Sequence, residues 1–184
     1  FKFPNFFRRL FAEGAFNSAF VPQFARILEA EGRETARAFA ERTLSVLISV
    51  LLPFMLLVQA GMPYLMVVVA PGFVSDPEKF VLTVELTRLT FPYLLFMALV
   101  ALLGGVLNSL ERFWAAAAAP ILLNIMLISA LVLFRDTFST VGHALAWGVT
   151  ISGAAQLMML MFATRATGMV LSLPRPCLTP QVRK

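Results

Sequence analysis

Long, uninterrupted apolar runs limit what this chain can fold into more than any other feature. Several of them exceed the roughly 20 apolar residues that cross the hydrocarbon core of a bilayer. The chain is 59% hydrophobic and only 14% charged, which is far from the usage of soluble domains. The runs are continuous, whereas the strands of a membrane barrel alternate apolar and polar residues. The sequence therefore predicts an all-α, polytopic transmembrane helical bundle.

Helix-breaking residues divide the chain into five predicted transmembrane helices. Pro71 ends one helix, and Ser75 and Asp76 are alternative caps for the next, which begins at Pro77. Pro92 predicts a kink within that helix. The predicted helices cover about residues 1–30, 43–70, 76–108, 112–134 and 141–163, and a polar, proline-containing segment follows at 167–184.

The stretch 30–42, AEGRETARAFAER, is polar and helix-prone and carries charges of both signs. We interpret it as a solvated connection at the membrane interface; a helix that docks a partner is the alternative and has no further support. The chain opens with Phe1 inside a predicted helix, so we expect a piece of a longer protein.

Basic residues collect on one side of the predicted bundle. Nine of them fall on that side and two on the other, which by the positive-inside rule predicts that the richer side is cytoplasmic. The first helix then descends from outside to inside, and Arg8 and Arg9 lie at membrane depth in its outer half. The richer set is Arg26, Arg33, Arg37, Arg42, Arg112, Arg165, Arg175, Arg183 and Lys184, and the other is Lys79 and Arg135.

Several function classes find little support in the composition. The single cysteine, Cys177, excludes an internal disulfide and a cysteine-based metal set. The lone histidine, His143, fits a structural or interfacial role better than a ligand role. The net charge of +5 follows membrane topology, so we expect no nucleic-acid partner. With no nucleophile–base set, metal spacing or phosphate loop in view, we expect neither an enzyme nor a bound metal or cofactor.

The first thirteen residues, FKFPNFFRRLFAE, are densely aromatic and yet charged. Charges on apolar helices are costly and usually face a bundle interior or a wet cavity. Arg9 and Glu13 are spaced i,i+4 and can pair within the helix. Arg8 has no acidic residue three or four positions away on either side. Arg8 therefore needs an acid from elsewhere, or water, or an anionic ligand.

Polar residues inside the other predicted spans have competing interpretations. Glu85 and Arg88 are spaced i,i+3, so they either pair with each other or line an aqueous cavity. Asn124 is expected to form an interhelical hydrogen bond rather than a ligand site, and Gln156 is a further polar insertion. Small residues recur every four positions at Ala101, Gly105 and Ser109, and at Gly148 and Ser152, which predicts close helix packing.

Motifs along nearly the whole chain resemble one known family. The opening stretch FKFPNFFRRLFAEGAFNSAFVPQF looks like the second transmembrane helix of the MurJ (MviN) family of lipid II flippases, and it is the most specific match. The likeness weakens after Gly168. The helices that follow are matched by APGF at 70–73, DPEKF at 76–80, LTFPYLLF at 89–96, GGVLNSLERF at 104–113, PILLNI at 120–125 and ALAWGVTISGAAQL at 144–157.

The resemblance implies a fold, a cargo and a site. The family belongs to the multidrug/oligosaccharidyl-lipid/polysaccharide exporter superfamily, so this chain would supply helices two through six of the amino-terminal lobe of a two-lobed transporter. Such a protein would flip lipid II, the undecaprenyl-pyrophosphate-linked peptidoglycan precursor, across the bacterial cytoplasmic membrane by alternating access. Arg8 matches an arginine of the cationic central cavity, and Arg9 and Glu13 belong to the same motif as candidate substrate-binding residues. Lipid II, membrane lipids and the cell-wall synthesis machinery are the implied partners.

Two other functions stay open on the residues alone. One is a transporter of the same superfamily with a different cargo, such as a drug or a polysaccharide-unit lipid. The unpaired positive charge of Arg8 argues against a cationic cargo. The other is a membrane scaffold, in which the arginines only bond to carboxylates of other helices.

Overall fold

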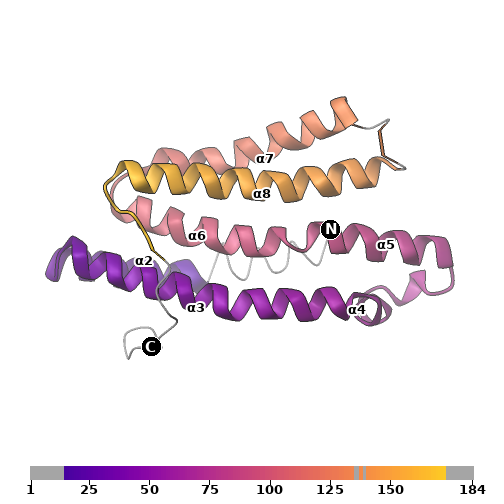
Figure 1. Ribbon diagram of the computed structural model, residues 1–184, viewed down its shortest axis with the longest axis horizontal. Coiled ribbons are helices and arrows are strands. Elements are labelled where there is room, and N and C mark those ends of the chain that lie inside the picture. The colour runs from indigo at the N-terminus through magenta and orange to yellow at the C-terminus, as the bar shows by residue number, and fades with distance from the viewer. Residues whose placement is uncertain (1–14, 135–136, 139, 173–184) are drawn as a thin grey trace.

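The computed structural model describes residues 15–134, 137–138 and 140–172, and every regular element in this part of the chain is a helix. The long helices lie side by side along the long axis of the molecule (Figure 1). The prediction of an all-α bundle is confirmed. The elements are α2 (Ala15–Ala30), α3 (Arg33–Ala60), α4 (Met62–Val69), the 3-10 turn η2 (Pro71–Phe73), α5 (Pro77–Thr90), α6 (Tyr93–Ser109), α7 (Phe113–Phe134) and α8 (Val141–Ala166).

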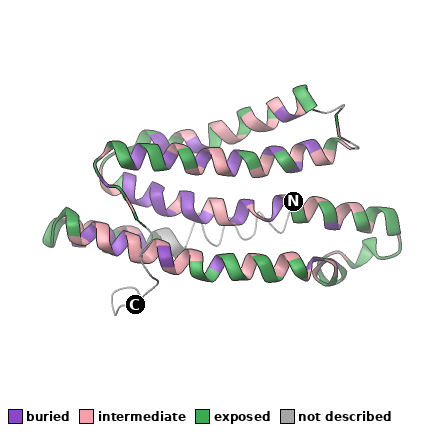
Figure 2. Ribbon diagram, viewed as in Figure 1, coloured by how far each residue is buried: buried purple, intermediate pink, exposed green. Residues whose placement is uncertain are grey.

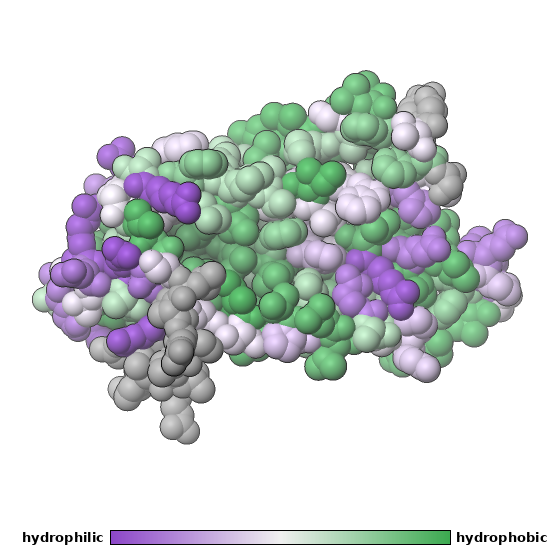
Figure 3. All heavy atoms as spheres, in the orientation of Figure 1, coloured by the Kyte–Doolittle hydropathy of each residue, from purple (hydrophilic) through white to green (hydrophobic). Residues whose placement is uncertain are grey.

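The outer surface of the bundle is apolar, as expected where the bilayer is the solvent. Leu57 of α3, Val132 of α7 and Phe162 of α8 are 73%, 72% and 67% exposed. Figure 3 shows apolar side chains across the middle of one face and polar side chains gathered towards its two ends. The chain is therefore a multi-pass membrane protein. Within the described residues, four helical stretches are long and apolar enough to cross a membrane: Arg33–Ala60, Pro77–Ser109, Phe113–Phe134 and Val141–Ala166.

The helix α3 starts earlier than the predicted second span. It begins at Arg33, inside the stretch 30–42 that the sequence suggested as a connection. Phe39 is buried in the core, while Nε of Arg37 lies 2.9 Å from a carboxylate oxygen of Glu41, one turn later in the helix. Because the charged residues occupy one side of these turns and apolar residues the other, packing extends the helix through the polar stretch.

Prolines and a glycine break two of the predicted spans. α3 ends at Ala60 with Gly61 as its cap, and α4 follows with Pro63 in its first turn. The backbone turns at Pro92 between α5 and α6, as predicted for that proline.

Of the two candidate caps for α5, Asp76 takes the position and accepts a hydrogen bond from the backbone N–H of Lys79 at 3.3 Å. The Lys79 ammonium, 2.6 Å from the other carboxylate oxygen, holds the pKa of Asp76 below its ordinary 3.8.

The helix α6 is the centre of the bundle. It is buried along most of its length, and α2, α3, α7 and α8 all pack against it (Figure 2). A Cβ added at Gly105 would lie 3.0 Å from Cγ2 of Val21 in α2, so only a small residue allows this approach. A Cβ at Gly148 of α8 would lie 2.8 Å from Cβ of Ala130 in α7. The small-residue spacing therefore marks real helix contacts at both positions.

The basic residues of the connections come together at one end of the bundle. The end of α2, the start of α3, the α6–α7 turn and the end of α8 lie at the left of Figure 1, opposite the α4–α5 and α7–α8 connections. We call the left end the arginine-rich end; it holds Arg33, Arg37, Arg112 and Arg165, while Lys79 lies at the other end. That the arginine-rich end faces the cytoplasm stays a prediction.

Candidate functional site

The predicted site residues Arg8, Arg9 and Glu13 lie outside the residues that the structure describes. The helix α2 follows them directly in the sequence, and its described part is firmly held. The ring of Phe20 stacks on that of Phe39 in α3, with centroids 5.6 Å apart and planes 10° apart. Together with the close approach to α6, this anchors α2 on two neighbouring helices. The role of the three charged residues stays a prediction.

A cavity of about 190 Å³ between α6, α7 and α8 contains a buried amide. Gln156 of α8 lines it and is 1% exposed, and its side-chain nitrogen has no hydrogen-bond partner among the described residues. Pro120 of α7 lines it too; because proline has no N–H, it leaves the carbonyl of Ala116, one turn earlier, without a helical bond. Unmet hydrogen-bonding groups are costly in a low-dielectric interior. The cavity can therefore bind a small polar group.

A second hollow, of about 220 Å³, lies between α3, α6 and α8; we call it the α3–α8 groove. Leu44 of α3, Leu103 of α6 and Met161 of α8 are among its apolar walls, and Arg165 lies at its arginine-rich end. Arg165 is exposed and forms no ion pair with any described residue. The groove therefore joins a hydrocarbon-lined wall to a cationic end.

The chain after α8 returns across the arginine-rich end to α3. The carbonyl of Thr167 accepts a hydrogen bond from Nη2 of Arg33 at 3.3 Å. The backbone N–H of Ser172 donates to Oε1 of Glu41 at 2.8 Å. Two separate turns of α3 thus hold this return segment, residues 167–172, against the bundle.

Of the two alternatives for Glu85 and Arg88 in α5, the i,i+3 ion pair is not formed. The carboxylate of Glu85 lies 3.5 Å from Nε2 of His143, whose Nδ1 is 2.8 Å from Oγ1 of Thr140. Arg88 is exposed and forms no ion pair within the described part of the chain. The reason is tertiary: α5 packs against α8, which brings His143 to Glu85 from a distant part of the sequence. These contacts agree with a structural role for His143.

The amide that is buried between α6, α7 and α8 is Gln156 rather than Asn124. Asn124 is exposed on α7 and has no hydrogen bond to the described residues, so the expected interhelical bond is not formed there. In the sequence, Gln156 is a polar insertion in an apolar span. It follows Gly148 and Ser152 at intervals of four, and all three are buried on one face of α8. That spacing was the available signal.

The described hollows offer binding groups rather than a catalytic set. No group of three or more histidine, cysteine, aspartate or glutamate side chains lies close enough together, among the residues described, to hold a metal ion. One hollow presents an amide, and the other presents hydrocarbon and a guanidinium. Such surfaces suit the recognition of a lipid or a small polar molecule.

Comparison with known proteins matches the whole chain to one family. The family model described as "Lipid II flippase MurJ" matches residues 1–184. The chain is 47% identical over 188 residues to a "Probable lipid II flippase MurJ" of Rhizobium tropici. The matched region covers 100% of this chain and 35% of that protein. It is 46% identical to the protein of the same description from Rhizobium meliloti (strain 1021), with the same coverage. A "Lipid II flippase MurJ" of Burkholderia cenocepacia is 36% identical over 92% of the chain and 33% of its own length. The chain thus spans about a third of the length of these relatives.

Proposed function

The chain belongs to the MurJ family of lipid II flippases, and from that premise we propose that the whole protein moves lipid II from the inner to the outer leaflet of the bacterial cytoplasmic membrane. The observation that carries the proposal is the family match along all 184 residues. The fold supports it, because the apolar helices are long enough to cross a bilayer and Gln156 is kept inside the bundle. The cargo crosses chemically unchanged.

Arg8 is the residue that we assign to the lipid II headgroup. Lipid II carries a pyrophosphate, and the planar guanidinium presents its N–H donors as a fork that fits phosphate oxygens. No acidic residue stands three or four positions from Arg8 in the sequence, which leaves Arg8 available for an anion. Arg9 and Glu13 complete the motif, and their i,i+4 spacing would allow them to pair if this stretch is helical.

Transport follows from alternating access between two lobes. The described bundle forms part of the amino-terminal lobe, and a second lobe rocks against it around a central cavity. With the arginine-rich end in the cytoplasm, the headgroup enters from that side while the lipid tail stays in the bilayer. The cell-wall synthesis machinery, which uses lipid II, is the expected partner on the outer side.

Replacing Arg8 in the full-length protein tests this assignment. We expect Arg8→Ala to lower lipid II flipping by about tenfold or more, since a lost charge-assisted hydrogen bond is worth at least one factor of ten. Arg8→Lys should restore only part of the rate, because lysine keeps the charge and loses the fork. The measurement is the appearance of lipid II in the outer leaflet of cells that depend on the variant.

Arg42→Ala is the matched control, since Arg42 lies at the cytoplasmic end of α3 by the same topology and should leave flipping unchanged. Normal flipping by Arg8→Ala would refute the headgroup assignment and favour the scaffold role. A parallel flux assay with a cationic dye separates cargo classes, and dye transport without lipid II transport would refute the proposed cargo.

A further inference from the structure

We propose that the α3–α8 groove binds one acyl chain of a resident anionic phospholipid, such as phosphatidylglycerol, and that Arg165 binds its phosphate. This site is separate from the cargo site at Arg8. It rests on the described groove alone and does not depend on what the protein transports.

The walls of the groove select a hydrocarbon chain. Leucine, isoleucine and methionine side chains of three helices form them, and the hydroxyl of Thr164, the other polar group of the lining, donates to the carbonyl of Leu160 within α8 at 2.7 Å. An apolar hollow of this kind offers water no hydrogen bonds, so it is filled by hydrocarbon rather than by water. The volume of about 220 Å³ suits part of one chain and not a folded peptide segment.

The return segment closes the groove at the arginine-rich end. Met169 is 4% exposed and belongs to the core of the bundle, and Leu171 joins the groove lining. The bonds of this segment engage Arg33 and Glu41, and Glu41 is also the partner of Arg37. The groove therefore has a held end wall, which distinguishes it from an open seam between two helices.

Arg165 is the cationic residue in the lining of the groove. It lies in the last turn of α8, where a spanning helix reaches the headgroup layer, and it lines the groove. No described acid pairs with it, while the nearby Arg37 is already bonded to Glu41 at 2.9 Å. Basic pockets between transmembrane helices bind anionic lipid headgroups by this geometry. An anionic lipid fits better than a zwitterionic one, because its phosphate is not already neutralised by its own amine.

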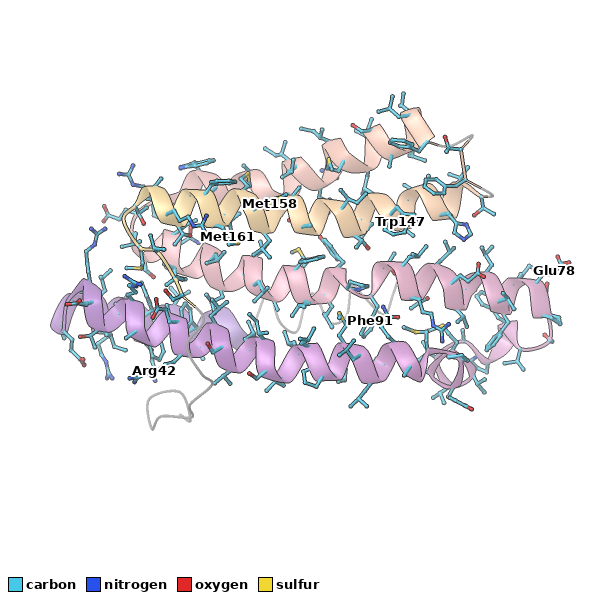
Figure 4. The ribbon with its side chains drawn as sticks, in the orientation of Figure 1. Arg42, Glu78, Phe91, Trp147, Met158 and Met161 are labelled. Atoms are coloured by element: carbon cyan, nitrogen blue, oxygen red, sulfur yellow. The ribbon has the colours of Figure 1, made fainter. Side chains whose placement is uncertain are left out.

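Two pairs of residues allow a sharp test. Arg42 is two residues from the groove residue Leu44 and so lies on the other side of α3, and Figure 4 shows it directed away from α8. Met158 is 55% exposed on α8 and does not line the groove, whereas Met161 does. Arg42 and Met158 are therefore matched controls for Arg165 and Met161.

The experiment measures lipids retained by the purified full-length protein with native mass spectrometry, after reconstitution in nanodiscs of equal phosphatidylglycerol and phosphatidylethanolamine. We expect Arg165→Gln to lower retained phosphatidylglycerol by about tenfold, the loss of one charge-assisted contact, and Arg42→Gln to leave it unchanged. Met161→Trp should displace the chain by filling the groove, while Met158→Trp should not. Thermal unfolding of each variant shows that it is folded.

Equal losses of retained phosphatidylglycerol with Arg165→Gln and Arg42→Gln would overturn the proposal, because lipid binding would then depend only on the general surface charge. Retention by Met161→Trp at the wild-type level would overturn the groove assignment. Copurified lipid II in place of phosphatidylglycerol would overturn the choice of occupant and identify the groove as a cargo-tail site. A separate measurement of flipping activity tests the proposed function and does not test this lipid site.

Discussion

At the scale of single residues, two glutamines lie near prolines that interrupt helical hydrogen bonding, and only one of them forms a hydrogen bond. A proline leaves a carbonyl one turn earlier without its helical partner. Pro92 leaves the carbonyl of Arg88 without this partner, and Gln59 of α3 supplies the donor instead, with its amide nitrogen 2.9 Å from the Arg88 carbonyl oxygen. Beside Pro120, Gln156 lines the same cavity as Ala116, yet its amide nitrogen is unpartnered among the described residues. One amide therefore stabilises the bundle, and the other is held there at a cost.

Replacing these glutamines by methionine should change stability in opposite directions. Gln156→Met removes a buried amide that lacks a partner and should raise the free energy of unfolding by about 1 kcal/mol. Gln59→Met removes a formed hydrogen bond and should lower it by about the same amount. Thermal unfolding of the full-length protein in one detergent compares them directly. A destabilised Gln156→Met variant would mean that the cavity holds a polar partner for the amide.

At the scale of elements, side chains of two other helices form hydrogen bonds to the backbone at the break between α5 and α6. Gln59 bonds it to α3, and the hydroxyl of Thr150 in α8 donates to the carbonyl of Leu89. Neighbouring helices can thus satisfy backbone groups that a proline frees inside a membrane. The helix contacts beside the break depend on small residues, since a Cβ at Gly153 would lie 2.7 Å from Cδ2 of Tyr93.

Two glycines in neighbouring helices should respond differently to alanine. At Gly148 the new Cβ would meet Cβ of Ala130 at 2.8 Å, and this atom sits next to the α7 backbone and cannot turn away. We expect Gly148→Ala to cost about 1–3 kcal/mol of unfolding free energy.

Gly104→Ala is the control, because its nearest contact would be an ordinary 3.6 Å to Cβ of Ala116. It should be neutral or stabilising by up to about 1 kcal/mol through helix propensity. Chemical denaturation in mixed micelles measures both variants, and equal effects would contradict the close α7–α8 contact.

At the scale of the whole molecule, the arrangement of helices sorts charge to one end. Arg33, Arg112 and Arg165 come from three connections that are far apart in the sequence, and the bundle brings them to the same end. The return segment crosses that end from α8 to α3, and hydrogen bonds to Arg33 and Glu41 hold it there. The orientation of this end decides which side of the membrane these arginines face.

Cysteine labelling tests that orientation with a matched pair. Glu34 and Glu78 are exposed glutamates in the first turns of α3 and α5, and these two turns lie at opposite ends of the bundle (Figure 1). In a Cys177→Ser background, a membrane-impermeant maleimide added to intact cells with a permeabilised outer membrane should label Glu78→Cys and not Glu34→Cys. Both should react after lysis. The reverse pattern would place the arginine-rich end outside.

Apolar run length, proline and small-residue spacing determined by themselves that this chain is a membrane bundle of helices, with a break at Pro92 and close contacts at Gly105 and Gly148. These signals are local, because a helix in a bilayer satisfies its own backbone. Tertiary structure alone decided that Glu85 meets His143, that Gln156 is buried while Asn124 is exposed, and that Arg165 lines a groove together with residues of α3. Each of these depends on which face of one helix meets another, and that choice is made by packing between segments distant in the sequence.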